Sequence, residues 1–488
     1  MAFENGVIER DYFYIQVRLA SPLCVSSGES EYTDSDVERD FDGNPFVAGT
    51  SLAGAFRSYL LQTEKINAVE NLFGNIKNQT GYQSRFYVSD LTLEEGCTIA
   101  VRNQTKLKDK VAVTGAKFDM ENVEKDTAGS FYIEMEFRKN DSAELKNTAY
   151  RFFKKIIYGI DSGEITFGSN KSNGFGYLSI QDIYGRGFGT DMNNHPLINA
   201  KYCADFSEWV SFDKWSMEKQ NCQFDYKAII SEVGAKPLYT TLRVPLKIKS
   251  NINIRQYITG YGEDDSEHIS RTVTDEKKQE KKIPIIPGSS WKGSIRSQCE
   301  HILHELDMWN ETLIRKMFGF IENEKKPDDT FIENEEKDDG DKKVPDAAIS
   351  SVYIEESDIE NGHYLSVMRN QIDRFSGSTV THALFQESIC VHGECELTIH
   401  IRKDIDEKGA DKADKNAWMI GLLLLAVKDL QNGYLAVGGE AGIGRGIFAS
   451  NGTIQIFTDE KEKPCDEDTI QAYIRKLADK KEEMKNVT

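Results

Sequence analysis

The chain repeats itself once, and this internal duplication constrains its fold more than any other feature of the sequence. Asn44–Arg57 (NPFVAGTSLAGAFR) recurs as Ile283–Arg296 (IPIIPGSSWKGSIR). Four shorter segments then recur in the same order: Leu72–Gly74 as Met317–Gly319, Arg102–Gln104 as Arg369–Gln371, Thr114–Phe118 as Thr381–Phe385, and Gly168–Gly176 as Gly438–Gly446. Ordered matches of this kind predict a tandem of two related units of about 200 residues each.

The unit boundaries follow from the spacing of the repeated segments. We expect a first unit at residues 1–199, a linker at 200–236, a second unit at 237–458 and a charged C-terminal helix at 459–488. The second unit carries an extra segment at 321–345. This segment contains ten acidic residues and five lysines, a composition typical of a solvated or disordered insertion.

Each unit shows the same order of hydrophobic patterns: strand, helix, a long irregular middle, strand, helix and strand. In unit one the strands are expected at residues 12–23, 130–138 and 176–184, and the helices at 51–65 and 148–160. In unit two the strands are expected at 242–249, 394–402 and 453–457, and the helices at 290–306 and 417–430. This order is the split βαβ pattern. The sequence therefore predicts an α+β protein of two tandem ferredoxin-like (RRM-like) units with inserted segments.

Composition excludes several classes of protein. With 488 residues, 39% of them hydrophobic, the chain is long enough for more than one buried core and is not disordered overall. Its longest apolar run, Trp418–Val427, is about half of what a membrane-spanning helix needs. The first residues also lack the basic start of a secretory signal. We therefore expect a cytoplasmic protein that does not contact a membrane.

The net charge of −20 would ordinarily count against a partner that carries phosphates. Part of this charge is local, because the ten acids of the insertion at 321–345 exceed its five lysines. The repeated glycine-rich motifs are themselves neutral to basic. The net charge therefore does not exclude a local interface with nucleic acid.

The eight cysteines are scattered without a C-x-x-C pair, so we expect no disulfide framework. Cys299, His301 and His304 share one expected helix, but only the two histidines are spaced to lie on the same face. Ordinary helix residues are therefore the favoured interpretation over a metal site.

Two glycine-containing motifs occur in each unit. The later one, G-x5-G-x-G, has its glycines at Gly168, Gly174 and Gly176 in unit one and at Gly438, Gly444 and Gly446 in unit two. Glycine at these positions allows either a tight helix-to-strand connection or the close approach of another backbone. The spacing alone leaves both interpretations open.

The earlier motif, P-G-S-S-x-K-G, precedes a helix of unit two. Ser289, Ser290 and Lys292 would place hydroxyls and a positive charge beside the free N–H groups of that helix, with Arg296 one turn later. Such a helix start suits an anion, and the alternative is an ordinary capped helix with a solvated arginine. In unit one we expect Thr50–Ser51 to cap the matching helix. The glycine-to-lysine spacing is not that of a Walker loop, which disfavours a nucleotide triphosphatase.

Together, these motifs on duplicated ferredoxin-like units resemble the RAMP superfamily of CRISPR-associated proteins. Each unit is similar to the backbone subunit of type III interference complexes. A single chain with two such units is similar to the fused double-backbone proteins of the type III-D branch. The segment Arg369–Glu387 resembles the thumb region of that family, which ends in an apolar strand with a glutamate. The likeness spans most of 12–180 and 242–457.

The resemblance implies a subunit that grips guide RNA without reading its sequence, next to complementary target RNA and other type III subunits. Contacts to phosphates position nucleic acid in this way. The residues implied for RNA binding are Ser51, Arg57, Arg102, Gly168, Lys171, Gly174 and Gly176 in unit one, and Ser289, Ser290, Lys292, Arg296, Arg369, Gly438, Gly444, Arg445 and Gly446 in unit two. Unit one has Ala48 and Ala53 where the family has proline and lysine. Its helix start is therefore expected to bind phosphate less strongly.

The resemblance also implies an aspartate, in the loop after the first strand, that cleaves target RNA. Alignment of the family's D-S-x-V on Val37 places this residue at Asp34, with Asp36 as the fallback. By itself, an acid in a polar loop is more often a solvated turn residue. In the family context, Asp34 would hold Mg²⁺ or another divalent cation, or orient the attacking 2′-hydroxyl.

In unit two, alignment of Val273 with Val37 puts Ser270 opposite Asp34, and Asp265 and Asp275 remain alternatives. We therefore expect unit two to bind RNA and to cut it poorly or not at all. A non-catalytic RNA-binding subunit of the same kind of complex is the alternative function. A stand-alone nuclease is disfavoured because the eight histidines show no repeated placement.

Overall fold

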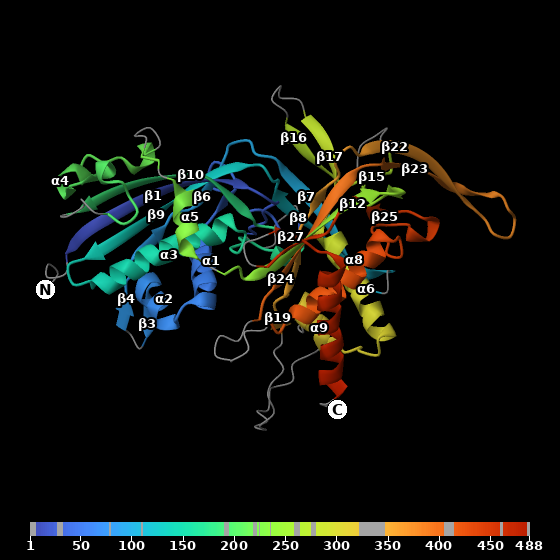
Figure 1. Ribbon diagram of the computed structural model, residues 1–488. Helices are drawn as coiled ribbons and strands as arrows, with labels where there is room; N and C mark the ends of the chain where they lie inside the picture. Colours follow the sequence, from blue (N-terminus) through green and yellow to red (C-terminus); the bar gives the residue numbers. More distant parts are fainter. Residues whose placement is uncertain are drawn as a thin grey trace, which may run out of the picture. The chain divides into compact units, whose positions relative to one another are not determined.

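The computed structural model describes residues 6–26, 33–77, 80–108, 111–189, 195–217, 222–223, 225–234, 236–257, 264–274, 280–321, 347–404, 414–458 and 462–485. The chain folds into two compact units, Met1–Pro237 and Leu238–Thr488, which we call unit one and unit two (Figure 1). The expected insertion at 321–345 lies, except for its first residue, outside the described residues.

Unit one is built on a sheet whose central strand is β1 (Val7–Leu19). This strand is antiparallel to β10 (Leu178–Gly189) on one side and to β9 (Ala128–Arg138) on the other. The sheet continues beyond β9 with the short strands β5 (Phe86–Val88), β6 (Leu91–Leu93) and β2 (Phe46–Val47). In space, the last core strand therefore lies beside the first, which is the ferredoxin-like order.

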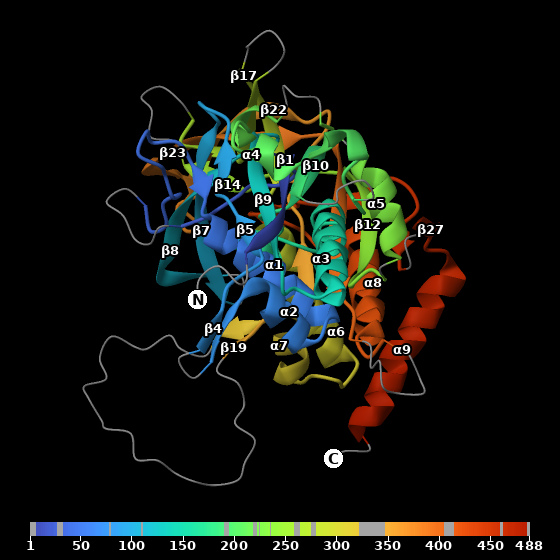
Figure 2. The same ribbon diagram turned by 90° about the vertical axis from the view of Figure 1, so that its left-hand side faces the viewer.

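Helices α1 (Gly49–Thr63), α2 (Ile66–Phe73) and α3 (Ala143–Asp161) lie together in unit one (Figure 2). Side chains alternate between the two faces of a strand, so Phe13 and Ile15 of β1 point to the same face and are fully buried. The ring of Phe13 lies 4.1 Å from that of Phe153 in α3. The helices therefore cover this face of the sheet.

The stretch expected as a linker, 200–236, contains β11 (Cys203–Ala204), α4 (Phe206–Trp209) and α5 (Tyr226–Val233). β11 pairs with β10 at the edge of the sheet, and α5 packs against α3. The indole N–H of Trp209 donates to the hydroxyl of Tyr12 at 2.8 Å. Much of this stretch is therefore folded onto unit one.

Unit two repeats the arrangement around β12 (Tyr239–Ile248). The partner strands are β24 (Glu394–Arg402) and β20 (Val352–Ile354) on one side, and β25 (Phe448–Ser450), β26 (Gln455–Phe457) and β27 (Glu462–Pro464) on the other. The helices are α6 (Gly288–Glu305), α7 (Glu311–Phe318), α8 (Ala417–Gln431) and α9 (Glu467–Lys485). The two units confirm the predicted α+β fold of tandem ferredoxin-like repeats.

The apolar run Trp418–Val427 lies in the buried helix α8, which packs against α9. Gly421 allows this close approach, because a Cβ atom there would lie 2.3 Å from the carbonyl oxygen of Tyr473. Within the described parts of the chain, no helix is both long and apolar enough to span a membrane.

A long antiparallel hairpin precedes β9 in unit one and β24 in unit two. It consists of β7 (Ile99–Lys108) and β8 (Val111–Val123) in unit one, and of β22 (His363–Ile372) and β23 (Thr379–Val391) in unit two. Figure 1 shows the unit-two hairpin extending well beyond its sheet. Short strands complete the two units: β3 (Asn75–Lys77), β4 (Thr80–Tyr82), β13 (Asn251–Ile252), β14 (Arg255–Tyr257), β15 (Ser266–His268), β16 (Ser270–Thr274), β17 (Glu280–Ile286), β18 (Phe320–Ile321), β19 (Ala347–Ala348) and β21 (Ser357–Asp358).

Candidate nucleic-acid interface

The acidic loop of unit one is held at the base of the β7–β8 hairpin. Asp34 is exposed, and its Oδ2 accepts a hydrogen bond of 2.9 Å from the backbone N–H of Asp119. The next residue, Ser35, forms a parallel bridge with Met120, and its carbonyl oxygen accepts from the N–H of Glu121. The backbone of β8 therefore orients Asp34 while its carboxylate faces solvent.

Unit two holds an aspartate in the same way. Asp265 is exposed, and its Oδ2 accepts a hydrogen bond of 2.9 Å from the backbone N–H of Gln386 in β23. The N–H of Asp265 donates in turn to the carbonyl oxygen of Gln386 at 2.8 Å. Ser266 then pairs in parallel with Glu387, as Ser35 pairs with Met120.

Strand pairing corrects the alignment that put Ser270 opposite Asp34. Val37 pairs with Ser26 in unit one, and His268 pairs with Arg255 in unit two. The counterpart of Val37 is therefore His268, five residues before Val273.

The counterpart of Asp34 is therefore Asp265. Ser270 lies farther along the chain in β16, and Asp275 lies outside the described residues. The sequence signal for this match is short: D-S-D at 34–36 and D-S-E at 265–267. The fallback residue Asp36 is buried and accepts from the hydroxyl of Thr33, so it faces the protein and is less suited to meet RNA.

The start of α1 differs from the expected capped helix. Its N-cap is Ala48, without a side-chain cap, so Thr50 and Ser51 lie in the first turn. The N–H of Gly49 donates to Oδ1 of Asp90 at 2.7 Å. A carboxylate of the protein therefore occupies one donor of this helix start, which supports the expectation of weak phosphate binding there.

The start of α6 has no such carboxylate partner among the described residues, and it adds a lysine. Its N-cap is Pro287, without a side-chain cap, and Ser289 and Ser290 follow in the first turn. Lys292 is partly buried and has no hydrogen-bond or ion-pair partner among the described residues. Burial, with a smaller effect of Arg296, lowers the pKa of Lys292 to about 8. An anion bound here would stabilise the charged lysine.

Two further cations of unit one also lack a protein partner in the described part of the chain. Lys171 in the glycine loop is partly buried, and burial lowers its pKa. Arg57 of α1 is partly buried, and its Nε is without a hydrogen bond. Arg296, the unit-two counterpart of Arg57, pairs with Glu300 on its own helix at 2.9 Å.

The glycine loops combine both interpretations that the sequence left open. A Cβ atom on Gly176 would lie 1.9 Å from the carbonyl oxygen of Phe167, and one on Gly446 would lie 2.0 Å from that of Val437. These glycines, with Gly168 and Gly438, are therefore needed for packing within each unit. Gly444 has a left-handed φ of 84°, is exposed, and has nothing within 4 Å of an added Cβ atom. Its counterpart Gly174, with a φ of 83°, is buried, so of these two glycines only Gly444 leaves room for another backbone.

Three of the arginines expected to contact RNA are paired with carboxylates of the protein. Arg102 is buried and pairs with Glu124 at 2.8 Å. Arg369 and Arg445 both pair with the fully buried Glu387, at 3.0 and 2.6 Å. These arginines therefore hold the bases of the hairpins, because carboxylates of the protein already use their charge.

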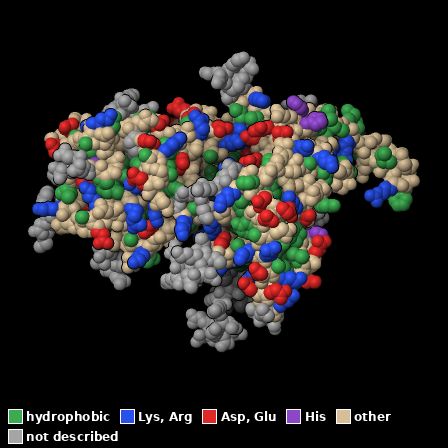
Figure 3. All heavy atoms as spheres, viewed as in Figure 1, with side chains coloured by type: hydrophobic (Ala, Val, Ile, Leu, Met, Phe, Trp, Pro, Cys, Tyr) green, Lys and Arg blue, Asp and Glu red, His purple; other side chains and the backbone are tan. Residues whose placement is uncertain are grey.

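The unit-two hairpin, the predicted thumb, exposes large apolar side chains near its end. Ile372, Phe375 and Leu384 are each more than half exposed. Hydrophobic side chains are visible on this hairpin in Figure 3. An aromatic side chain such as Phe375 can stack on a base, and aliphatic side chains can insert between bases.

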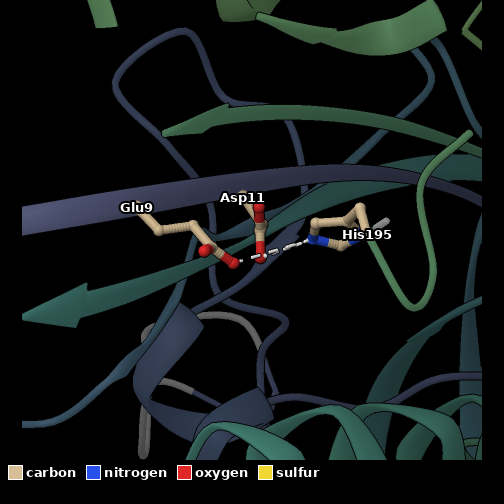
Figure 4. Close-up of side chains that lie close together, drawn as sticks. All are labelled: Glu9, Asp11 and His195. Carbon is tan, nitrogen blue, oxygen red and sulfur yellow. Dashed lines mark ion pairs between the residues drawn. The ribbon is translucent and has the colours of Figure 1, made fainter. Parts of the chain in front are cut away.

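Glu9, Asp11 and His195 bring three potential metal ligands within 4.8 Å of one another (Figure 4). However, Nδ1 of His195 accepts the backbone N–H groups of Leu197 and Ile198 at 3.1 and 2.8 Å. The ring proton therefore lies on Nε2, which donates to Asp11 at 3.1 Å and has no lone pair left for a metal.

The surroundings of this cluster agree with a hydrogen-bond network. The hydroxyl of Tyr150 lies 2.9 Å from Asp11, and Lys146 pairs with Glu9. The three residues of α6 that the sequence suggested as possible metal ligands do not face one site. Cys299 is buried, His301 pairs with Glu305, and His304 stacks on Trp309.

Comparison with known proteins places the chain in a family. The sequence profile of the RAMP superfamily matches residues 16–179 and 246–449, one region in each unit. The chain belongs to the RAMP superfamily. The matched regions of this RAMP protein include both loop aspartates, both hairpins and both glycine loops.

A search of curated proteins finds no match. Among solved structures, one similar chain comes from the cryo-EM structure of the type III-B Cmr-beta bound to cognate target RNA. It shares 10% sequence identity with a TM-score of 0.29, and the match covers 36% of the present chain and 61% of the other.

Proposed function

We propose that this RAMP protein is a guide-RNA-binding backbone subunit of a type III CRISPR ribonucleoprotein, and that Asp34 and Asp265 cleave guide-paired target RNA. The observation that carries the cleavage part is their shared geometry. Each aspartate is exposed, and each is held through Oδ2 by a backbone N–H at 2.9 Å. Strand pairing next to the two acids is also the same, so we propose cleavage by both units in place of the poor cutting first expected of unit two.

The RNA-binding part of the proposal rests on cations that the described protein leaves without partners. A partly buried lysine or arginine gains a strong interaction when a phosphate approaches it. Lys171 and Arg57 provide such groups in unit one, and Lys292 provides one in unit two. None of these contacts would read a base, so the grip would be independent of sequence.

In the proposed cleavage, the 2′-oxygen of a target nucleotide attacks the adjacent phosphorus. The bond between phosphorus and the 5′-oxygen of the next nucleotide breaks, which leaves a 2′,3′-cyclic phosphate and a 5′-hydroxyl. The aspartate accepts the hydrogen bond of the attacking hydroxyl and takes its proton, directly or through water, and the 5′-oxygen gains a proton from solvent. The hydrogen bond from the backbone N–H to Oδ2 keeps the carboxylate oriented during this attack.

The exposed carboxylate of Asp34 or of Asp265 fits a hydrated divalent cation such as Mg²⁺, which is usually bound by one or two carboxylates together with phosphates and waters. When bound, the ion would reduce the negative charge that develops on the phosphate.

We further assign the chain to the type III-D branch, because two backbone units occur in one polypeptide. Its partners would be guide RNA, complementary target RNA and the other subunits of the complex. The test is to incubate the assembled complex with labelled complementary RNA, with and without Mg²⁺. Two Mg²⁺-dependent cuts support the proposal, and an intact target leaves a non-catalytic RNA-binding subunit.

RNA affinity should depend on pH through Lys292. Its folded pKa of about 8 lies below the usual lysine value, and a bound phosphate raises it again. Binding therefore takes up a proton above pH 8. We expect the affinity for guide RNA to fall about fivefold between roughly pH 7.5 and 9.5. A filter-binding series over this range measures the effect.

Arginine stays charged over the whole range, so Lys292→Arg should flatten this pH profile. The exposed Lys476 of α9 offers a matched control, because Lys476→Arg should leave the profile unchanged. An identical pH profile in Lys292→Arg and in the unaltered chain would show that Lys292 does not meet phosphate.

A further inference from the structure

Glu387 is a fully buried carboxylate at the base of the β22–β23 hairpin. Arg445 of the glycine loop donates to its Oε1 at 2.6 Å, and Arg369 of β22 donates to the same oxygen at 3.0 Å. The amide of Asn253 donates to Oε2 at 3.2 Å. Burial opposes the charge, but the two arginines outweigh it and hold the pKa of Glu387 below its usual range. An ionised Glu387 thus joins three segments of unit two.

A second carboxylate extends this ion cluster. Glu440 of the glycine loop pairs with Arg445, with Arg369 at 2.6 Å and with Arg255 at 2.8 Å. Two carboxylates and three guanidinium groups therefore connect the hairpin, the glycine loop and β14. We call Glu387, Arg369, Arg445 and Glu440 the unit-two junction.

Unit one has apolar side chains at the positions of Glu387 and Arg445, while the amides of Gln104 and Asn170 donate to the sulfur of Met120. Met120 is the counterpart of Glu387, because Ser35 pairs with Met120 as Ser266 pairs with Glu387. Phe175 precedes the last loop glycine, as Arg445 does in unit two. Met120, Phe175 and Cys24 form a buried hydrophobic cluster.

The unit-two junction lies next to the loop acid. Gln386, the neighbour of Glu387 in β23, donates its N–H to Asp265 at 2.9 Å and accepts from the N–H of Asp265 at 2.8 Å. Ser266, the neighbour of Asp265, pairs with Glu387 itself. A shift of β23 at Glu387 would therefore move the backbone that holds Asp265.

We propose that Glu387 is a positioning residue, which pairs with Arg369 and Arg445 to hold β23 and the glycine loop in the register that presents Asp265 to RNA. This inference rests on the proposed cleavage by unit two. Removal of one partner of a buried ion pair leaves the other charge uncompensated, whereas replacement of both by well-packed apolar groups is tolerated. Met120 and Phe175 of unit one supply such an apolar pair.

The test compares Glu387→Met, Arg445→Phe and the double variant in the full chain, assembled with guide RNA. One readout is the rate of the unit-two cut relative to the unit-one cut on the same target. The other is amide hydrogen exchange of Gln386, with Asp119 of unit one as the internal control.

Each single variant should slow the unit-two cut about tenfold relative to the unit-one cut, and should speed exchange at Gln386 about tenfold without an effect at Asp119. The double variant should return both values to within about threefold of the unaltered chain. A structural defect spread over the chain would instead slow both cuts and loosen both amides.

The two readouts separate this inference from the proposed function. If the unaltered chain makes no unit-two cut, cleavage by Asp265 is refuted, and the exchange of Gln386 alone decides the role of Glu387. Unchanged exchange in a folded Glu387→Met variant overturns the inference, and so does a double variant no better than the singles. If Glu387→Met fails to fold, Glu387→Gln, which keeps the shape and loses the charge, is judged by the same two criteria.

Discussion

Asp34→Asn and Asp265→Asn should each remove one of two cuts in the target RNA, with the rate at that position reduced about 100-fold or more. Asparagine keeps the size of aspartate and can still accept the backbone hydrogen bond from Asp119 or Gln386. It cannot accept the proton of the 2′-hydroxyl or supply a negative charge to a cation. The rates are measured separately for each product band on end-labelled target under single-turnover conditions.

Three comparisons make this result specific. The double variant should leave the target intact while guide RNA stays bound. Asp36→Asn should have little effect, because Asp36 is buried against Thr33. Loss of a cut with Asp275→Asn, but not with Asp265→Asn, would contradict the structural equivalence of Asp34 and Asp265. Two cuts that persist in the double variant would remove both aspartates from the mechanism.

Gly446→Ala should strongly destabilise unit two. The φ of Gly446 is 72°, where an L-residue costs about 1–2 kcal/mol, and its Cβ would lie 2.0 Å from the carbonyl oxygen of Val437. The backbone must move to relieve this contact, so we expect a total loss of about 3 kcal/mol or more. The thermal transition of unit two should fall by about 6–12 °C in calorimetry.

Gly444→Ala is the matched control in the same loop. Its φ of 84° carries a similar backbone cost, but nothing lies within 4 Å of the added Cβ. We expect a loss of only about 1 kcal/mol, with a larger effect on RNA affinity than on stability. Equal shifts in the two variants would mean that the packing of Gly446 against Val437 does not limit the stability of the loop.

The fold was largely predictable because it depends on patterns that are local in the sequence. The alternation of Tyr12–Leu23 and the helical spacing of Ser51–Lys65 correspond to β1 and α1, with ends shifted by a few residues. The buried helix α8 follows from ten apolar residues in a row. Each of these elements buries an apolar face, and the spacing of apolar residues along the sequence already specifies that face.

The candidate site was less predictable, because the acidic loop that carries the aspartate differs in length between the two units. Sequence alignment of the acidic loops through Val37 and Val273 was wrong in register, since these loops differ in length between the units. Only the pairing of Ser35 with Met120, and of Ser266 with Glu387, shows which acids correspond. That pairing forms between residues far apart in the chain, and no local pattern encodes it.

The sequence by itself determined that the chain is a duplication of a ferredoxin-like unit, with paired glycine loops and helix starts that carry cations. Only the tertiary structure decided which charges remain for a ligand. Arg445 pairs with Glu387, which is 58 residues away in the sequence, and Arg369 pairs with Glu440, which is 71 residues away. Lys171 and Lys292 have no such partner among the described residues. An ion pair depends on distance in space, and the sequence sets that distance only through the folded hairpin and loop.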